Sequence, residues 1–404
     1  MVMNIQKHDA YHVALELREQ LSSHTRRFGL LLGAGTSIAV GLDGINGLTK
    51  KVGTKLDKDG KAAYEKTLGE LGEKRTVEYV LSRLNLYREL LTESSTKEID
   101  GFTYTSANTL TRAVRSAIYQ LLNIDPPGGL RPQQTLAQFI KGIRRDYPVE
   151  IFCTNYDLLL ERAMEYVGVP YFDGFVGSVS PFFAPDSVEA TGEAESRDVY
   201  PPTSWTRIWK LHGSIGWYLK ETMDGTHRIT RLPSYVPREG EELVIWPSRE
   251  KYVEARKVPF MSLLDRLRKF LASGECLLLV IGYACQDEHI MEMIFQGLRA
   301  NMRLAVAIMN HGPLSNNLQS AAYNYRNLSV YGPDYACIGG VCGTWSEPSR
   351  KRNEGENWPF WDEANKKFTL GDFRSFADFL EQIIGLMPEE TKPNDSLEKN
   401  SSTA

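Results

Sequence analysis

Apolar residues in the first part of the chain follow two different periods. Within residues 7–27 they recur every three or four positions, which predicts a helix with one buried face. The run from Phe28 to Leu32 is instead continuously apolar and stops at Gly33, as expected of a buried parallel strand that leads into a turn. The chain is therefore predicted to begin with a helix followed by a strand.

The same two patterns alternate through much of the remaining chain. Strands are predicted at residues 149–153 and 207–211, and the continuous apolar runs at residues 276–281 and 304–309 predict two more. Helices are predicted near residues 133–144, 158–167, 259–272 and 373–383. Strands that alternate with helices are typical of an α/β protein, so we predict a Rossmann-like parallel sheet with helices on both faces.

Several stretches interrupt this alternation. Residues 50–125 are rich in Lys, Glu and Leu and carry few strand signals, which predicts a small helical insertion. Residues 173–206 and 311–371 predict irregular connections, whereas the polar, turn-rich residues 221–258 are typical of a hairpin region. The predicted division is an α/β domain of residues 1–49 and 126–386, the insertion 50–125, and a disordered tail of residues 387–404.

Composition narrows the class of protein. The net charge of −4 argues against direct binding of nucleic acid by this chain alone. The five cysteines are scattered, which predicts reduced thiols rather than a disulfide framework, and the isolated pair Cys337 and Cys342 falls short of the four ligands of a structural zinc site. The sequence shows no signal peptide and no apolar run near the roughly 20 residues of a membrane span. We therefore expect a cytoplasmic protein without a metal site.

Four of the predicted strands end in a small or polar residue, namely Gly33, Asn155, His212 and Gly282. Open parallel sheets bind ligands outside the carboxyl ends of their strands. These four strand ends are therefore predicted to converge on one crevice.

The motif Gly33-Ala34-Gly35-Thr36-Ser37 could bind a phosphate, because glycine lets a ligand approach the backbone amides closely. The usual dinucleotide fingerprint would place a third glycine where Ile38 stands. A glycine turn after a strand is also a common structural turn. The motif alone leaves both interpretations open.

Asn155 and His212 each have a structural and a chemical interpretation. Asn155 could begin the following helix, but Asp157 can already cap it, so the Asn155 amide is available to hold a ribose hydroxyl or a water. His212 could be a hydrogen-bonded core histidine or a general base suited to neutral pH.

Other polar residues carry weaker signals. Asp287 is expected to cap the helix that begins near His289, with a ribose contact as the second interpretation. Asn310 could be a turn residue or a nucleoside contact, and Glu78 is expected to be solvated or salt-bridged on a helix. A Gly-x-Ser-x-Gly elbow and a Walker-type loop are both missing from the sequence, which argues against serine hydrolase and P-loop chemistry.

Taken in order, the strand-end motifs resemble those of the Sir2 (sirtuin) superfamily. The matching pieces are Gly33-Ala34-Gly35-Thr36-Ser37, Thr154-Asn155-Tyr156-Asp157, Leu211-His212-Gly213, Ile281-Gly282 and the strand that ends in Asn310. The resemblance implies that NAD is bound through Gly33, Ala34, Gly35 and Ser37. It implies chemistry at Asn155, Asp157 and His212, and contacts from Gly282 and Asn310 to the adenosine side.

The departures from the sirtuin pattern indicate which reaction to expect. Protein-deacylating sirtuins carry a zinc ribbon after the His-Gly motif, but residues 214–275 contain no cysteine, and Thr154 replaces the usual Gln before the Asn. These traits resemble the Sir2-like proteins of bacterial antiphage defence, which degrade NAD. The resemblance implies an NAD+ hydrolase without zinc, a homo-oligomer, and activation by a partner such as a HerA-type ATPase. An NAD-dependent protein deacylase and a non-catalytic NAD or ADP-ribose-binding assembly subunit are the alternatives.

Overall fold

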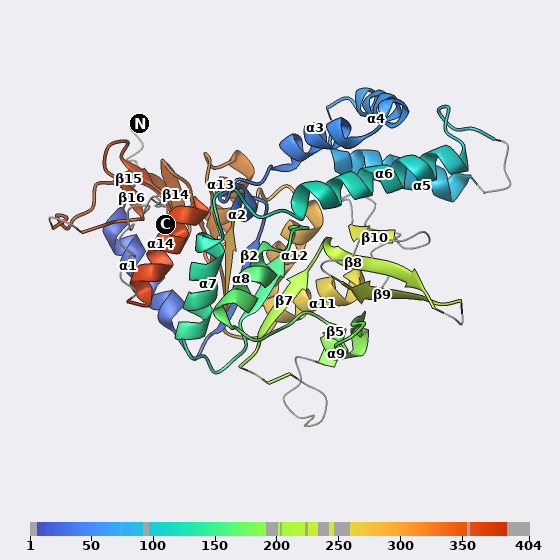
Figure 1. The fold of residues 1–404 in the computed structure, drawn as a ribbon. Helices are drawn as coiled ribbons and strands as arrows, with labels where there is room; N and C mark the ends of the chain where they lie inside the picture. Colours follow the sequence, from blue (N-terminus) through green and yellow to red (C-terminus); the bar gives the residue numbers. More distant parts are fainter. Residues whose placement is uncertain are drawn as a thin grey trace, which may run out of the picture.

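A ten-stranded sheet with helices on both faces forms the core of the protein in a computed structural model (Figure 1). The structure describes residues 6–73, 75–91, 97–190, 201–202, 204–222, 225–232, 242–245, 259–353 and 356–385. The strand order is β1-β15-β14-β13-β12-β11-β2-β3-β7-β4, and the stretch from β13 to β4 is parallel. The prediction of a mainly parallel α/β sheet is therefore confirmed.

The strands of this sheet have the following bounds: β1 Gln6–Asp9, β2 Arg27–Leu32, β3 Glu150–Cys153, β4 Tyr171–Phe172, β7 Thr206–Lys210, β11 Cys276–Ile281, β12 Leu304–Met309, β13 Leu328–Tyr331, β14 Tyr335–Ile338 and β15 Val341–Ser346. A smaller antiparallel sheet contains β5 Phe175–Val176, β6 Phe182–Phe183, β8 Gly213–Glu221, β9 His227–Arg231 and β10 Glu242–Ile245. Strands β16 Trp361–Asp362 and β17 Lys367–Phe368 pair separately.

Alternating side chains of the central strands pack against two different groups of helices. Phe28, Leu30 and Leu32 of β2 lie in one apolar cluster, together with α1 Ala10–Ser22, α7 Arg131–Gly142, α8 Leu159–Val167 and α14 Phe373–Ile383. Leu31 lies in the opposite cluster, together with α11 Phe260–Leu271, α12 Glu288–Ala300 and α13 Asn316–Asn324. Because successive side chains of a strand point to opposite faces, a continuously apolar strand serves both clusters.

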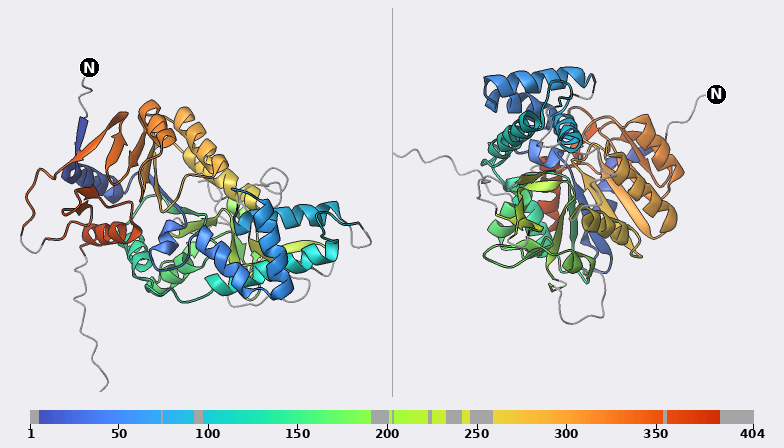
Figure 2. Two further views of the ribbon diagram at one scale, coloured as in Figure 1. Left: turned by 90° about the horizontal axis from the view of Figure 1, so that it is seen from above. Right: turned by 90° about the vertical axis from the view of Figure 1, so that its right-hand side faces the viewer.

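The remaining long helices form a third apolar cluster at one end of the molecule, far from β14 and β15 (Figures 1 and 2). These helices are α3 Ile45–Lys55, α4 Lys58–Glu70, α5 Val77–Leu90 and α6 Tyr104–Leu122. They share their cluster with Val40, Leu158 and Ile215, which lie beyond the carboxyl ends of β2, β3 and β7. The helices are therefore packed onto the loops at that edge of the sheet. The division of the chain into a domain, an insertion and a tail stays a prediction, and residues 387–404 lie outside the described residues.

The predicted amino-terminal helix begins later than its apolar spacing indicates. Residues 6–9 form β1, which pairs with β15, and Asp9 then caps α1 by accepting hydrogen bonds from the amides of Tyr11 and His12. A strand pairing between the two ends of the chain cannot be inferred from the local period of either segment.

The prediction that residues 311–371 are irregular is wrong. This stretch contains α13 and strands β13 to β17, and Gly339 and Gly340 form the turn between β14 and β15 with φ angles of 60° and 83°. A Gly-Gly pair at positive φ is a strong hairpin signal that apolar spacing does not detect. The hairpin register places Cys337 opposite Cys342, and the two form a disulfide, which corrects the expectation of reduced thiols for this pair.

A second predicted loop region is also more regular than expected. Residues 173–206 contain β5, β6 and the short helix α9 Pro185–Ala190. Strands β8 and β9 pair as an antiparallel hairpin next to β10, as the turn-rich composition of residues 221–258 indicates, although much of that range lies outside the described residues. Within the described ranges, each helix is too short or too polar to span a lipid bilayer.

Candidate functional site

Neighbouring strands bring the predicted site residues to one edge of the sheet. Leu32 of β2 pairs with Cys153 of β3, and Cys153 pairs with Lys210 of β7. Asn155 and His212 each follow these paired residues by two positions, so they leave the sheet at the same level. On the other side of β2, Ile281 pairs with both Leu32 and Met309, which places Gly282 and Asn310 at this edge as well. The predicted convergence of the strand ends is what the structure shows.

The glycines of the Gly33–Ser37 motif are required by contact with a second protein loop. A Cβ atom on Gly33 would lie 2.6 Å from the carbonyl oxygen of Gly282, and one on Gly35 would lie 2.6 Å from the Gly282 Cα. Gly282 itself has a φ of +65°, and a Cβ there would lie 2.7 Å from the Thr36 amide nitrogen. The absence of side chains therefore lets the loops after β2 and β11 pack directly together.

The same packing uses most of the backbone amides in the motif. The amides of Gly33 and Gly35 donate to the carbonyl oxygens of Ile281 and Gly282, at 3.2 and 2.7 Å. The Thr36 and Ser37 amides donate to Gly33 and Ala34 within the motif, at 3.0 and 3.1 Å. Among the described residues, the amide of Ala34 is the one in this motif without a main-chain acceptor. An anion bound through the backbone here would therefore contact the Ala34 amide.

Asn155 connects the strand end of β3 to the glycine motif. Its side-chain amide nitrogen lies 3.0 Å from the Gly33 carbonyl oxygen and 2.9 Å from the hydroxyl oxygens of both Thr36 and Ser37. Because a carbonyl oxygen only accepts hydrogen bonds, the NH₂ group of Asn155 must be the part that faces the motif. The Asn155 Oδ1 atom has no hydrogen-bond partner within the described part of the chain, so this acceptor is available to a ligand or water.

Asp157 completes the same network. Its Oδ2 atom accepts a hydrogen bond of 2.6 Å from the Ser37 hydroxyl, and its Oδ1 atom accepts one of 3.1 Å from the Leu159 amide at the start of α8. Helix α8 begins one residue later than predicted, so Leu158 is at the N-cap position and Asp157, one residue before it, binds the first helical amide; the helix ends at Gly168 in the left-handed conformation, as expected. The carboxylate is buried, so a hydrogen-bonded negative charge lies directly beside Asn155.

His212 pairs with a carboxylate from a distant loop. Its Nε2 atom lies 3.1 Å from Oδ2 of Asp287, and the two side chains are only 11% and 7% exposed. Asp287 also caps α12, as predicted, by accepting hydrogen bonds from the amides of His289 and Ile290. Both residues carry a signal in the sequence, but their contact does not, because 75 positions separate them.

Two further groups at this edge were missed in the sequence. The buried ammonium group of Lys210 donates to the Asp157 carbonyl oxygen and lies 3.3 Å from Glu161 Oε1. Burial opposes its charge, but the attraction of Glu161 prevails and raises the pKa of Lys210 above its usual value. A lysine at the end of a short strand gives no sequence signal for such a buried ion pair.

Tyr156 extends the site toward the helical cluster. Its hydroxyl donates to Oε1 of Glu78 on α5 at 2.8 Å, so Glu78 has a specific partner at the site and is not simply solvated. Burial, with the Glu78 carboxylate adding to it, raises the pKa of Tyr156 well above its usual value. The Tyr156 carbonyl oxygen also accepts a hydrogen bond from the Ile215 amide at 2.9 Å. One residue between Asn155 and Asp157 thus joins three parts of the structure.

Asn310 supports its own turn. Its side-chain amide nitrogen donates to the carbonyl oxygens of Gly312 and Pro313, at 2.6 and 3.1 Å. This is the turn role that the sequence analysis left open, and any contact with a nucleoside stays a prediction.

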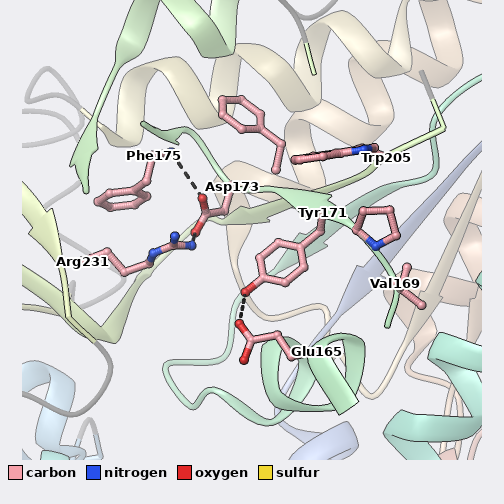
Figure 3. Close-up of a pocket in the computed structure, with 9 residues that line it drawn as sticks. Glu165, Val169, Tyr171, Asp173, Phe175, Trp205 and Arg231 are labelled. Carbon is pink, nitrogen blue, oxygen red and sulfur yellow. Dashed lines mark hydrogen bonds and ion pairs between the residues drawn. The ribbon is translucent and has the colours of Figure 1, made fainter. Parts of the chain in front are cut away.

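A pocket of about 380 Å³ lies away from these residues, at the opposite end of β7 (Figure 3). Tyr171 donates to Glu165 at 2.8 Å, and Arg231 forms an ion pair with the buried Asp173, whose pKa burial raises despite the attraction of Arg231. Trp205 lies on the other side of the pocket (Figure 3). Each of the three charged groups that line this pocket therefore already has a partner in the described structure. In the described residues, no group of three or more His, Cys, Asp or Glu side chains is arranged to hold a metal ion.

Part of the chain is similar to a known family of domains. Residues 149–331 match a family model described as the SIR2-like domain. This stretch is less than half of the chain and contains Asn155, Asp157, His212, Gly282 and Asn310, whereas the Gly33–Ser37 motif lies outside it. No curated protein matches the chain.

Solved structures with limited similarity include three Sir2 proteins. One comes from work on the structural basis for the mechanism and regulation of Sir2 enzymes. It has 15% identity and a TM-score of 0.38, and the match covers 77% of this chain and 89% of that one. Another is a mutant Sir2 homologue in complex with ADP-ribose, with 13% identity, a TM-score of 0.36 and coverage of 74% and 86%. A third is a mutant Sir2 with a p53 peptide and NAD, with 14% identity, a TM-score of 0.36 and coverage of 75% and 88%. Residues 149–331 of this α/β protein are thus similar to the SIR2-like domain.

Proposed function

We propose that the protein is an NAD+ hydrolase that cleaves the nicotinamide–ribose bond. The observation that carries this proposal is the buried network of Asn155, Ser37 and Asp157 beside the strand end that carries His212. Open parallel sheets bind ligands at this edge, and the family match over residues 149–331 supports NAD as the ligand.

Each side chain has a role that its surroundings support. The unpaired Oδ1 atom of Asn155 accepts a hydrogen bond from a ribose hydroxyl or from the attacking water. The buried carboxylate of Asp157 stabilises positive charge that develops on the ribose. His212 accepts the proton of the water. Gly33, Ala34, Gly35 and Ser37 line the phosphate side, and Gly282 and Asn310 the adenosine side.

The reaction then balances without a metal or a redox partner. The bond between the ribose C1′ and the nicotinamide nitrogen breaks, and its electron pair neutralises the pyridinium ring. A water oxygen forms the new bond to C1′, and the water proton moves to His212. The products are nicotinamide and ADP-ribose, and zinc has no part in this sequence of steps.

The biological setting that we propose is antiphage defence, in which depletion of NAD stops growth of the infected cell. An unrestrained enzyme of this kind would be toxic. We therefore propose that assembly, as a homo-oligomer or with a partner such as a HerA-type ATPase, activates it. The Tyr156–Glu78 hydrogen bond supports this proposal, because it joins α5 to the residue beside Asn155. A change in the packing of the helical cluster on assembly would thereby be transmitted to the site.

Chromatography of NAD incubated with the full chain, alone and with candidate partners, tests the proposal. We expect nicotinamide and ADP-ribose in at least one assembly, and a large loss of both with Asn155→Ala and His212→Ala. Asn317→Ala and His12→Ala are matched controls, because both side chains are exposed on other helices. Full turnover in the two site variants would refute the assignment. Acetyl-ADP-ribose formed only with an acetylated peptide would identify a deacylase, and NAD binding without turnover in each assembly would identify a binding subunit.

A further inference from the structure

The two carboxylate oxygens of Asp287 have separate partners. Oδ1 accepts hydrogen bonds from the amides of His289 and Ile290, at 3.1 and 3.4 Å, and so caps the first turn of α12. Oδ2 lies 3.1 Å from Nε2 of His212. Helix α12 therefore fixes the carboxylate, and the carboxylate in turn fixes the imidazole ring.

This pair joins loops that are not neighbours in the sheet. His212 follows β7 and Asp287 follows β11, and β2 and β3 lie between these two strands. With about 4.8 Å between adjacent strands, the two loops leave the sheet roughly 14 Å apart. The contact thus spans the strand ends that carry Gly33 and Asn155. Capping of α12 by Oδ1 does not by itself require His212 to lie beside Oδ2.

Chemistry decides which nitrogen of His212 carries the proton. A carboxylate only accepts hydrogen bonds, so Nε2 must be the donor in this pair. A neutral imidazole then has its lone pair on Nδ1. We propose that Asp287 is a positioning residue that holds His212 in the Nε2–H tautomer and thereby makes Nδ1 the nitrogen that accepts the proton of the attacking water. The catalytic part of this inference rests on the proposed function, whereas the tautomer does not.

Two substitutions separate this role from helix capping. Asn caps helices about as well as Asp, so Asp287→Asn should retain the thermal midpoint, whereas Asp287→Ala should lower it by about 2 °C. The side-chain NH₂ group introduced by Asp287→Asn would, however, donate to Nε2 and favour the opposite tautomer. We therefore expect kcat for NAD to fall by at least about 100-fold in Asp287→Asn, while KM changes by less than about threefold. Asp57, which caps α4 through the Gly60 amide, provides matched Asn and Ala controls that should not affect kcat.

Nitrogen NMR of the imidazole ring gives a readout that needs no turnover. Long-range ¹H–¹⁵N spectra of the full chain, recorded at a pH where the ring is neutral, distinguish the two tautomers, and the His212 signals are assigned by their loss in His212→Asn. We expect the Nε2–H pattern in the wild type and the Nδ1–H pattern in Asp287→Asn. An Nδ1–H pattern in the wild type, or one tautomer in both proteins, would overturn the inference, as would an unchanged kcat in Asp287→Asn. The expected spectra in a protein that never cleaves NAD would leave the tautomer assignment standing and refute the proposed hydrolase instead.

Discussion

The two ends of strand β3 both bury polar side chains, but they use them differently. At the amino end, both carboxylate oxygens of Glu150 are bound by Arg266, at 2.5 and 2.7 Å, and Oε2 also accepts a hydrogen bond of 2.9 Å from the indole of Trp209. At the carboxyl end, Asn155 donates to the glycine motif and keeps its Oδ1 atom without a described partner. At the amino end, the Glu150 carboxylate is fully hydrogen-bonded within an ion pair. At the carboxyl end, the Asn155 Oδ1 atom can still accept a hydrogen bond.

This difference shows what marks a candidate site in this fold. Burial is nearly the same at both ends, with Glu150 3% and Asn155 9% exposed, so burial does not distinguish them. What distinguishes the two ends is the number of hydrogen-bonding positions that are left unused among the described residues. By the same criterion, the pocket beside Trp205 is the weaker candidate despite its volume, because Glu165 and Asp173 both have partners there. The comparison can be tested by changing each end of β3 in turn.

The largest effect on stability is expected at the amino end of β3. Glu150→Ala leaves the guanidinium of Arg266 buried without its partner, which should lower the free energy of unfolding by about 3–5 kcal/mol. Urea denaturation measures this change. The exposed Glu292, paired with Arg299, gives a matched Glu→Ala control whose denaturation midpoint should not move. A Glu150→Ala protein as stable as the wild type would show that this end is not the structural anchor we describe.

The next effect concerns catalysis at the carboxyl end. Asn155→Ala removes the spare acceptor and should lower NAD turnover by about 100-fold or more, which corresponds to about 2.7 kcal/mol of transition-state stabilisation. Its cost in stability should be smaller than that of Glu150→Ala, at about 1–3 kcal/mol for the lost hydrogen bonds. The test is steady-state kinetics together with urea denaturation of the same sample. If Asn155→Ala lowers the free energy of unfolding but leaves NAD turnover unchanged, the carboxyl end of β3 has a structural role only, as the amino end does.

A smaller effect is expected at the loop that packs against the glycine motif. Gly282→Ala places a Cβ atom 2.7 Å from the Thr36 nitrogen at a φ of +65°, which should cost about 1–3 kcal/mol. Gly69 on α4 is the matched control, because nothing lies within 4 Å of its added Cβ, and Gly69→Ala should stabilise the protein by about 0.5–1 kcal/mol. Thermal denaturation compares the two, and the expected shifts have opposite signs.

The smallest effect is expected for the reactivity of the Cys153 thiol, at the end of β3. Burial raises the pKa of Cys153 on β3 to about 11, so at pH 8 only about one thiol in a thousand is ionised. Because the thiolate is the form that reacts, iodoacetamide should not modify Cys153 in the native protein, whereas it should after denaturation in urea. Mass spectrometry of tryptic peptides measures both states. Rapid native modification would mean that solvent reaches the last residue of β3.

Much of this organisation could be predicted from local sequence patterns. Continuous apolar runs predict β2, β11 and β12, because a strand buried on both faces is rich in apolar residues. Strands β3 and β7 are predicted as well, although they include the buried polar residues Glu150 and Lys210. The strand-end rule then placed Gly33, Asn155 and His212 at one edge. Local patterns could not reveal the pairs His212–Asp287 or Tyr156–Glu78, since each joins residues at least 75 positions apart.

The errors have equally specific causes. The hairpin of β14 and β15 was missed because its Gly-Gly turn leaves no apolar period, and β1 because its partner lies at the other end of the chain. The glycine motif was located correctly, but the structure gives its glycines a packing role against Gly282 that sequence spacing alone could not indicate.

The pairing of β1 with β15 has a consequence for how the protein is made. Gln6 is opposite Gly343, so β1 is translated long before the strand with which it pairs. At about 5–20 residues per second, that delay is roughly 20–70 s. During this time the central strands can assemble, while the edge of the sheet stays open. Strand β1 can therefore join the sheet only well after its own translation, once β15 has been made.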